Sequence, residues 1–302
     1  MKTYKKINSS NKIKKCVIAI GNFDGLHLGH QKVLRSAHSK AKKNNLKFGV
    51  ITFEPVPVMF FGKKKTNHRI NNLDQKISGL KKLKVDFVYI IKFNKKFSNL
   101  KPLSFIKKIL INNLNAKFIF VSKNFRFGKN REGNIETLKK NEKYFDYKTV
   151  ITKPLKKKNT ILSSTRIRKK ISLGLVKEVS KYLGRNWCIE GKVIKGKKRG
   201  RQIGFPTCNI KLGEYIVPRL GVYSIIAENN NFRKKGIANV GYRPTFSGKS
   251  LLLEVNIFGI KKNLYNKYLK ISFLRFIRRE NKFKNLKQLK IQIKKDIKIA
   301  KN

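Results

Sequence analysis

The sequence has few cysteines and no long apolar run, and each scarcity excludes a class of protein. Only three of its 302 residues are cysteines, and Cys16, Cys188 and Cys208 lie far apart. They form neither a disulfide framework nor a CxxC metal site, which fits a reducing cytoplasm. No apolar run approaches the length that spans a bilayer, and no signal-like apolar stretch follows the lysine-rich N-terminus. We therefore expect a cytoplasmic protein with no membrane partner.

Acidic residues are also scarce, and this leaves a large positive charge. The chain has 15 Asp and Glu against 74 Lys and Arg, a formal net charge of +59. Such a balance can indicate a nucleic-acid partner. Here the excess is mostly lysine, spread along the chain together with abundant Asn and Ile, which is typical of an AT-rich genome. No basic stripe interleaved with aromatics and no zinc-finger spacing is present. We expect weak nonspecific binding to nucleic acid but no dedicated nucleic-acid partner.

The first half of the chain alternates between strand-like and helical patterns. A length of 302 residues exceeds that of a usual single domain, so two domains are expected. Alternation of strands and helices predicts βαβ units and a parallel sheet, in which ligands bind at the carboxyl ends of the strands. The predicted strands are 17–20, 48–53, 85–91 and 117–121, and the predicted helices are 31–43, 73–83 and 103–113.

The pattern changes near residue 185. From 187 to about 276 the apolar runs are short and bounded by Gly, Asn and Pro, which predicts an antiparallel β-barrel or sandwich. Helical spacing returns at 286–299. We therefore predict two domains, 1–185 and 186–302. The predicted strands of the second domain are 187–194, 221–227, 235–240, 251–258 and 268–273.

The most informative segment is 21–30, GNFDGLHLGH, which lies between a predicted strand and a predicted helix. Its glycines allow a tight turn or the close approach of a ligand. His27 and His30 have HxGH spacing near a helix N-terminus, which favours anionic groups. Two imidazoles there can donate hydrogen bonds to a phosphoryl centre as its charge shifts, without a covalent intermediate. The segment predicts nucleotidyl transfer.

Two further segments could bind phosphate. In 163–168, SSTRIR, hydroxyl residues precede a helical run, and Ser or Thr at a helix start caps N–H groups that also bind phosphate. The segment 196–209, GKKRGRQIGFPTCN, is a basic loop punctuated by glycine that leads into a strand, and its backbone could cradle phosphates. Thr207 and Asn209 offer neutral oxygens for Mg²⁺ or phosphate. Glu254 lies inside an apolar run and is either a structural ion-pair partner or a catalytic base.

With these motifs in order, the chain resembles the bacterial bifunctional riboflavin kinase/FMN adenylyltransferases over nearly its whole length. GNFDGLHLGH, TFEPVP, NFRFGKNREGN and SSTRIR resemble the adenylyltransferase half, and GRQIGFPTCNI, GVY, ANVGYRPTF, LEVNIF and IRRENKF resemble the kinase half. The resemblance implies a Rossmann-like nucleotidyltransferase domain, followed by an antiparallel β-barrel kinase domain with a terminal helix. It implies flavins and ATP as substrates and Mg²⁺ as cofactor.

The resemblance also implies residue roles. Glu254 would deprotonate the ribityl hydroxyl of riboflavin, and Thr207 and Asn209 would hold Mg²⁺ and phosphates. His27 and His30 would stabilise the phosphoryl group in transfer. The other residues implied to bind ATP or phosphate are Gly21, Phe23, Asp24, Gly29, Asn124, Ser164, Thr165 and Arg168 for adenylyl transfer, and Gly196, Gly200 and Gly204 for the kinase.

Two alternatives stay open at this point. One is a monofunctional FMN adenylyltransferase whose second domain only binds flavin. The other is a basic nucleic-acid-binding protein on a retained fold, whose binding would collapse at moderate salt.

Overall fold

The computed structural model describes residues 1–5, 15–62, 67–157, 160–196, 199–245, 248–260 and 262–302. Contacts between residues divide the chain into two compact units. The first comprises Met1–Lys65 and Leu73–Ser163, and the second comprises Thr66–Asn72 and Ser164–Asn302. By these contacts the continuous part of the second unit begins at Ser164. The reason is that α8 (Ser164–Ser172) contacts α9 (Val176–Leu183), and α9 contacts the barrel strand β14.

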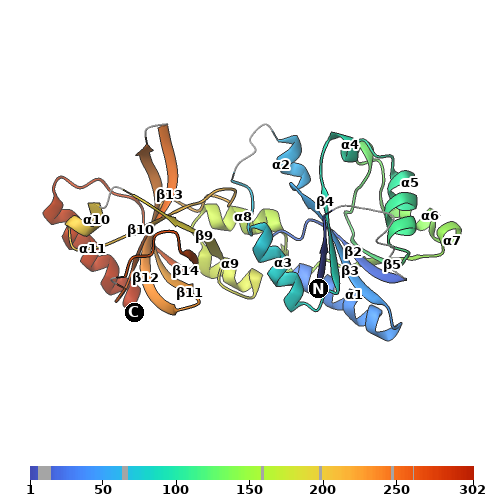
Figure 1. The fold of residues 1–302 in the computed structure, drawn as a ribbon, viewed down its shortest axis with the longest axis horizontal. Helices are drawn as coiled ribbons and strands as arrows, with labels where there is room; N and C mark the ends of the chain where they lie inside the picture. The colour runs from blue at the N-terminus through green and yellow to red at the C-terminus, as the bar shows by residue number, and fades with distance from the viewer. Residues whose placement is uncertain (6–14, 63–66, 158–159, 197–198, 246–247, 261) are drawn as a thin grey trace. The chain divides into compact units, whose positions relative to one another are not determined.

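The first unit is built on a six-stranded parallel sheet (Figure 1). The strand order is β1-β4-β3-β2-β5-β6, so the topological switch point lies between β2 and β5, where open α/β sheets bind ligands. The predicted parallel sheet is confirmed, and the sequence pattern missed only the two edge strands, β1 and β6. The strands are β1 (Lys2–Tyr4), β2 (Cys16–Ile20), β3 (Lys47–Glu54), β4 (Phe87–Lys92), β5 (Ala116–Ser122) and β6 (Lys148–Thr152).

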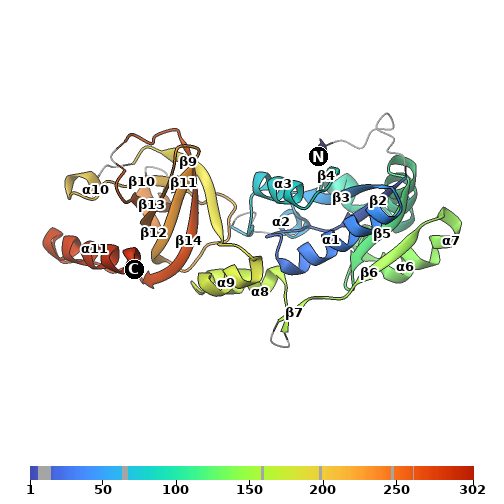
Figure 2. The ribbon, with the colours of Figure 1, turned by 90° about the horizontal axis from the view of Figure 1, so that it is seen from below.

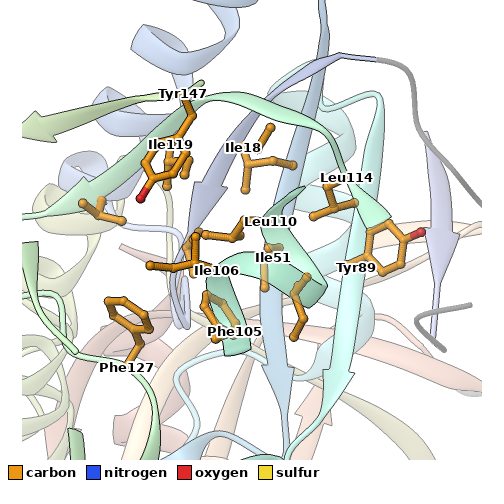
Figure 3. Packing of buried hydrophobic residues seen from close by; sticks show 14 of the residues in the cluster. Ile18, Ile51, Tyr89, Phe105, Ile106, Leu110, Leu114, Ile119, Phe127 and Tyr147 are labelled. Atoms are coloured by element: carbon orange, nitrogen blue, oxygen red, sulfur yellow. The ribbon is translucent and has the colours of Figure 1, made fainter. Parts of the chain in front are cut away.

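Helices cover both faces of this sheet. On one face, α1 (Leu28–Lys43) and α3 (Leu73–Lys82) share a buried cluster with Val17 and Ala19 of β2. On the other, α5 (Pro102–Phe105), the π-helical segment Ile106–Asn113 and α6 (Ile135–Lys140) share a second buried cluster with Ile18 and Ile20, part of which is drawn in Figure 3. Because both faces are covered, all five residues of β2 are buried, which explains its continuous apolar sequence.

The three helices predicted here are present, although the one expected at 103–113 is α-helical only in its first turn. Short elements complete the unit, namely α2 (Pro57–Phe61), α4 (Lys95–Ser98), the 3₁₀ turn Lys129–Arg131, α7 (Glu142–Phe145), and the paired strands β7 (Lys156–Lys157) and β8 (Thr160–Ile161).

The second unit is a closed six-stranded barrel with strand order β10-β13-β12-β11-β14-β9 (Figure 2). All of its strand pairs are antiparallel, so of the two predicted architectures the barrel is correct. Alternate residues such as Leu253 and Val255 fill its interior. The strands are β9 (Cys188–Ile194), β10 (Cys208–Lys211), β11 (Gly221–Asn229), β12 (Phe232–Thr245), β13 (Gly248–Ile257) and β14 (Tyr268–Arg278).

Two helices accompany the barrel. The predicted C-terminal helix is α11 (Leu286–Lys301), and its Ile293, Ile297 and Ala300 cover Val222 and Ile237 on the outside of the barrel. A short helix that the sequence pattern did not indicate, α10 (Arg199–Gln202), lies within the predicted phosphate loop 196–209.

A segment from the first half of the sequence packs in the second unit. We call residues 67–72 the strap. Arg69 bridges Tyr215 as in a parallel strand pair, and Ile216 N donates to Arg69 O at 2.8 Å. The indole Nε1 of the buried Trp187 donates to Ile70 O at 2.9 Å. The strap lies between α2 and α3 in the sequence, although both helices belong to the first unit.

Candidate active sites

The HxGH segment forms the predicted strand-to-helix turn at the carboxyl edge of the parallel sheet. The amide of Gly21 donates to Ile51 O on β3 at 3.1 Å, which anchors the start of the turn. Phe23, Gly25 and Leu26 have φ angles of +47°, +82° and +42°. Left-handed φ angles cost free energy at residues other than glycine, so the surrounding structure must hold the turn in this conformation. The turn ends at His27, the N-cap of α1.

His27 and His30 lie against each other. Their ring centroids are 3.6 Å apart, with an interplanar angle of 18°. The amide of His30 donates to Nδ1 of His27 at 3.2 Å, so a neutral His27 carries its ring proton on Nε2. A Cβ atom at Gly29 would lie 3.1 Å from the His27 ring, so glycine leaves room for this arrangement. The pair sits at the N-terminus of a 16-residue helix, where backbone amides and the helix dipole favour an anion.

The loop after β5 meets the same edge of the sheet, because β5 pairs with β2. The predicted ligand Asn124 is exposed in this loop, and Phe125 N donates to Ser122 O at 3.0 Å. Gly128 has φ +75°, and a Cβ there would lie 2.7 Å from Pro102 Cγ, so the loop requires glycine at this point. In the HxGH turn itself, Phe23 and Asp24, which were also predicted to bind ATP or phosphate, are buried.

An aromatic cluster lies at the carboxyl ends of β3 and β4. Phe93 contacts Phe53, Phe60, Phe61 and Phe97 with ring centroids 5.3–6.1 Å apart. Phe61 on α2 is 67% exposed. No sequence pattern indicated a role for these rings, although the prolines of TFEPVP mark their position. An exposed ring backed by others is suited to stack on a flat aromatic ligand.

The remaining predicted residues for adenylyl transfer lie on α8, in the second unit. Ser164 is the first residue of this helix, and Thr165 follows it. Arg168 Nε donates to the strap at His68 O, with a distance of 2.8 Å. The predicted helix start is confirmed, whereas the role of these residues toward pyrophosphate stays a prediction.

In the barrel, two of the predicted kinase residues, Asn209 and Glu254, lie in one row that extends across three strands. Asn209 of β10 lies opposite Glu254 of β13, and Glu254 lies opposite Asn239 of β12. Residues directly opposite one another in a sheet share a face, and because Leu253 and Val255 point inward, this face is the outside of the barrel. Asn239 Nδ2 donates to Glu280 Oε1 at 2.9 Å. The sequence pattern could not identify Asn239 as the cross-strand neighbour of Glu254, because the strand register was unknown.

Two of the predicted glycines lie against predicted ligands, Gly196 against Asn209 of this row and Gly200 against Thr207. A Cβ at Gly196 would lie 1.9 Å from Asn209 Nδ2, and one at Gly200 would lie 3.0 Å from Thr207 Oγ1. Gly204 differs, since no heavy atom of the described residues lies within 4 Å of such a Cβ, and its φ of +86° requires glycine for the turn itself. Asn209 Oδ1 is buried and has no hydrogen-bond partner among the described residues. A buried carbonyl oxygen in this state is a candidate ligand for a cation or a donor.

A pocket of about 550 Å³ opens beside Thr207. Its size suits a nucleotide or a flavin. Cys208, which lies between Thr207 and Asn209, also lines it, and burial raises the pKa of this thiol to about 11. The lining combines apolar barrel residues with a polar rim, and includes Val193, Arg201, Val255, Ile257, Lys262 and Tyr265.

Two features are absent from the described residues. No group of three or more His, Cys, Asp or Glu side chains among them could hold a metal ion. No helix in the described part of the chain is long and apolar enough to cross a membrane.

Comparison with known proteins assigns each unit to a class of enzyme. The FAD synthetase family matches residues 9–166, and the riboflavin kinase family matches residues 183–302. A parallel-sheet nucleotidyltransferase unit and a flavokinase barrel thus occur in one chain. Together with the relatives described next, these matches show that the chain belongs to the family of bifunctional riboflavin kinase/FMN adenylyltransferases.

The similarity extends over whole chains. The bifunctional riboflavin kinase/FMN adenylyltransferase of Buchnera aphidicola subsp. Schizaphis graminum is 42% identical, over 98% of this chain and 95% of its own. The protein of the same name from Haemophilus influenzae is 38% identical, over 97% and 96%. A crystal structure titled as a macrolide-efflux protein from Streptococcus pneumoniae superposes with a TM-score of 0.88 and 31% identity, covering 100% of this chain and 99% of that one.

Proposed function

We infer that this chain makes FAD from riboflavin in two steps, each of which consumes ATP. In the first step, the 5′-hydroxyl of riboflavin attacks the γ-phosphorus of ATP, giving FMN and ADP. In the second, a phosphate oxygen of FMN attacks the α-phosphorus of another ATP, giving FAD and pyrophosphate. The presence of both family domains supports two activities over a monofunctional adenylyltransferase or a nucleic-acid-binding protein.

The observation that carries the kinase assignment is the row Asn209–Glu254–Asn239. Glu254 acts as general base toward the riboflavin hydroxyl, and the flanking amides hold the substrate or its phosphates. The residues directly opposite Glu254 on both neighbouring strands are amides, whose side chains can donate hydrogen bonds to a substrate or its phosphates. Glycine at 196 and 200 lets the loop backbone approach Asn209 and Thr207 closely, and the pocket that Thr207 lines has room for the nucleotide or the flavin.

The same residues fit a magnesium ion. Mg²⁺ prefers oxygen ligands and is commonly held by one or two protein groups together with substrate phosphates. Asn209 Oδ1 is a buried oxygen without a partner among the described residues, and Thr207 Oγ1 lies two residues before it in the sequence. When bound, the ion would neutralise phosphate charge during transfer. Thr207 and Asn209 are therefore the proposed ligands.

For adenylyl transfer, we assign the central role to the stacked pair His27 and His30. Their donors face developing negative charge on the phosphoryl group as pyrophosphate leaves, and the N-terminus of α1 adds backbone amides. Asn124 at the same sheet edge contacts the nucleotide, and Ser164, Thr165 and Arg168 hold pyrophosphate. The exposed Phe61, backed by its aromatic cluster, stacks on the flavin ring.

The direct test uses the purified full chain with riboflavin, ATP and MgCl₂. Chromatography with fluorescence detection resolves riboflavin, FMN and FAD. We expect FMN to accumulate first and then to convert to FAD. Supplying FMN in place of riboflavin isolates the second step. Formation of neither product would refute the proposal, and FMN without FAD would leave only the kinase assignment. The cytoplasm as its place of action stays a prediction.

A further inference from the structure

Lys76 is a buried lysine to which the roles described so far assign nothing. It lies on α3 and is only 1% exposed. A buried ammonium group is costly unless it is hydrogen-bonded, and Lys76 Nζ donates to Thr52 Oγ1 at 3.2 Å. Thr52 is itself fully buried at the end of β3, and its hydroxyl donates to Asn22 O at 3.2 Å. Two hydrogen bonds therefore connect the ammonium group to the backbone of the HxGH turn.

The same helix supports the turn at a second point. One turn after Lys76, a Cβ at Gly79 would lie 2.4 Å from Leu26 Cδ1, so the glycine forms the notch into which Leu26 packs. Leu26 O in turn accepts from Gln31 Nε2 of α1 at 3.0 Å. Thus α3 holds both the start and the end of the segment 22–26.

The turn needs such support. Phe23 and Leu26 have left-handed φ angles without being glycine, a conformation that persists only when the surroundings fix it. His27 follows Leu26 directly, and its Nδ1 is bound to the amide of His30. A shift of the turn therefore moves both imidazoles together.

We propose that Lys76 is a positioning residue for adenylyl transfer. Its ammonium group, acting through Thr52, fixes the carbonyl of Asn22 and hence the place of His27 and His30 against the α-phosphate of ATP. The inference rests on the proposed adenylyltransferase activity and extends it to a helix that does not itself touch the reacting atoms.

The test compares Lys76→Met with Lys81→Met in the full chain. Lys81 lies on the same helix but is exposed, so it controls for the loss of one charge from α3. FMN-to-FAD conversion is measured with kcat and KM for ATP separated, and riboflavin phosphorylation in the same preparation reports on the kinase. Since misplacement by about 1 Å costs on the order of 10²-fold in rate, we expect Lys76→Met to lower kcat for FAD formation roughly 10- to 100-fold. Lys81→Met and the kinase should stay within about twofold of wild type.

Thr52→Val gives a second, independent arm that keeps the ammonium group and the side-chain shape. It should also lower kcat, and the double variant should be no slower than the worse single variant, because both act through one chain of hydrogen bonds. Additive losses would overturn the proposal, as would a folded Lys76→Met with unchanged kcat. If Lys76→Met does not fold, Thr52→Val alone decides by the same criterion. A wild-type protein that makes no FAD would refute the proposed function itself, which is a different result from a selective loss in the variants.

Discussion

Replacing Gly196 by alanine should disable the kinase while leaving the adenylyltransferase intact. The added Cβ would lie 1.9 Å from Asn209 Nδ2, against about 3.4 Å for an ordinary contact, so the two groups must separate by roughly 1.5 Å. The backbone of Asn209 cannot yield easily, because β10 is paired with both β13 and β9 at this residue. Its side chain must therefore rotate or the loop must move.

Either response displaces a proposed ligand from the row that contains Glu254. A displacement of about 1 Å in a reacting constellation costs on the order of 10²-fold in rate, and overpacking a fitted site costs about 1–3 kcal/mol of stability. We expect riboflavin phosphorylation to fall about 100-fold, with FMN-to-FAD conversion unchanged.

The assay measures both reactions on one preparation, with thermal unfolding as a check on the fold. Gly213→Ala is the control for backbone effects, because Gly213 has a φ of +58° while no heavy atom in the described part of the chain lies within 4 Å of its added Cβ. It should carry backbone strain without loss of kinase activity. A folded Gly196→Ala protein with a kinase rate within about twofold of wild type would refute the proposed role of Asn209.

Further predictions concern the other proposed groups. Glu254→Gln should lower riboflavin phosphorylation by roughly 10²-fold or more without affecting FAD formation from FMN, and unchanged FMN production would exclude Glu254 as the base. His30→Ala should lower adenylyl transfer by about 10²–10³-fold and leave the kinase near wild type, whereas loss of both activities in a folded protein would mean that the sites are coupled. Iodoacetamide should alkylate Cys208 about tenfold faster for each pH unit between about 7 and 10, because burial raises the pKa of this thiol to about 11 and only the thiolate reacts. Mass spectrometry measures the rate of alkylation, and a rate that stops rising near pH 8 would contradict the raised pKa. A fragment of residues 186–302 should phosphorylate riboflavin but unfold at a lower temperature than the full chain, because Trp187 loses the acceptor Ile70 O; an unchanged melting temperature would contradict the stabilising role of the strap.

Much of the fold was predictable because the two halves differ in periodicity. Continuous apolar runs such as 17–20 predicted buried parallel strands, and short bounded runs predicted the barrel. Edge strands were missed where burial on one side is weak, since β6 contains no fully buried residue. The strap was not predictable, because a short stretch between two helices gives no periodic signal of where it packs.

The sites were predictable only in part, for a related reason. Local motifs such as HxGH place their residues by sequence alone, and the structure agrees with the predicted turn. The cross-strand neighbours of Glu254 depend on strand register, which a pattern of alternating residues does not determine. Lys76 was missed because lysine at its position in the sequence DQKISGLKK looks like any other surface lysine of a helix.

The scarcity of carboxylates explains why the sequence alone left the role of Glu254 open. With 74 basic residues and 15 acidic ones, any carboxylate has cations available, so an ion pair is always a possible interpretation. Arg278 and Asp296 form a structural ion pair of this kind. The buried Asp296 accepts hydrogen bonds from Arg278 at 2.8–3.0 Å and from Gln292 at 3.0 Å. In the barrel, the residues opposite Glu254 on both neighbouring strands are the amides Asn209 and Asn239. In the proposed mechanism Glu254 is ionised when riboflavin binds, because a general base must keep its charge until it accepts the proton of the hydroxyl group.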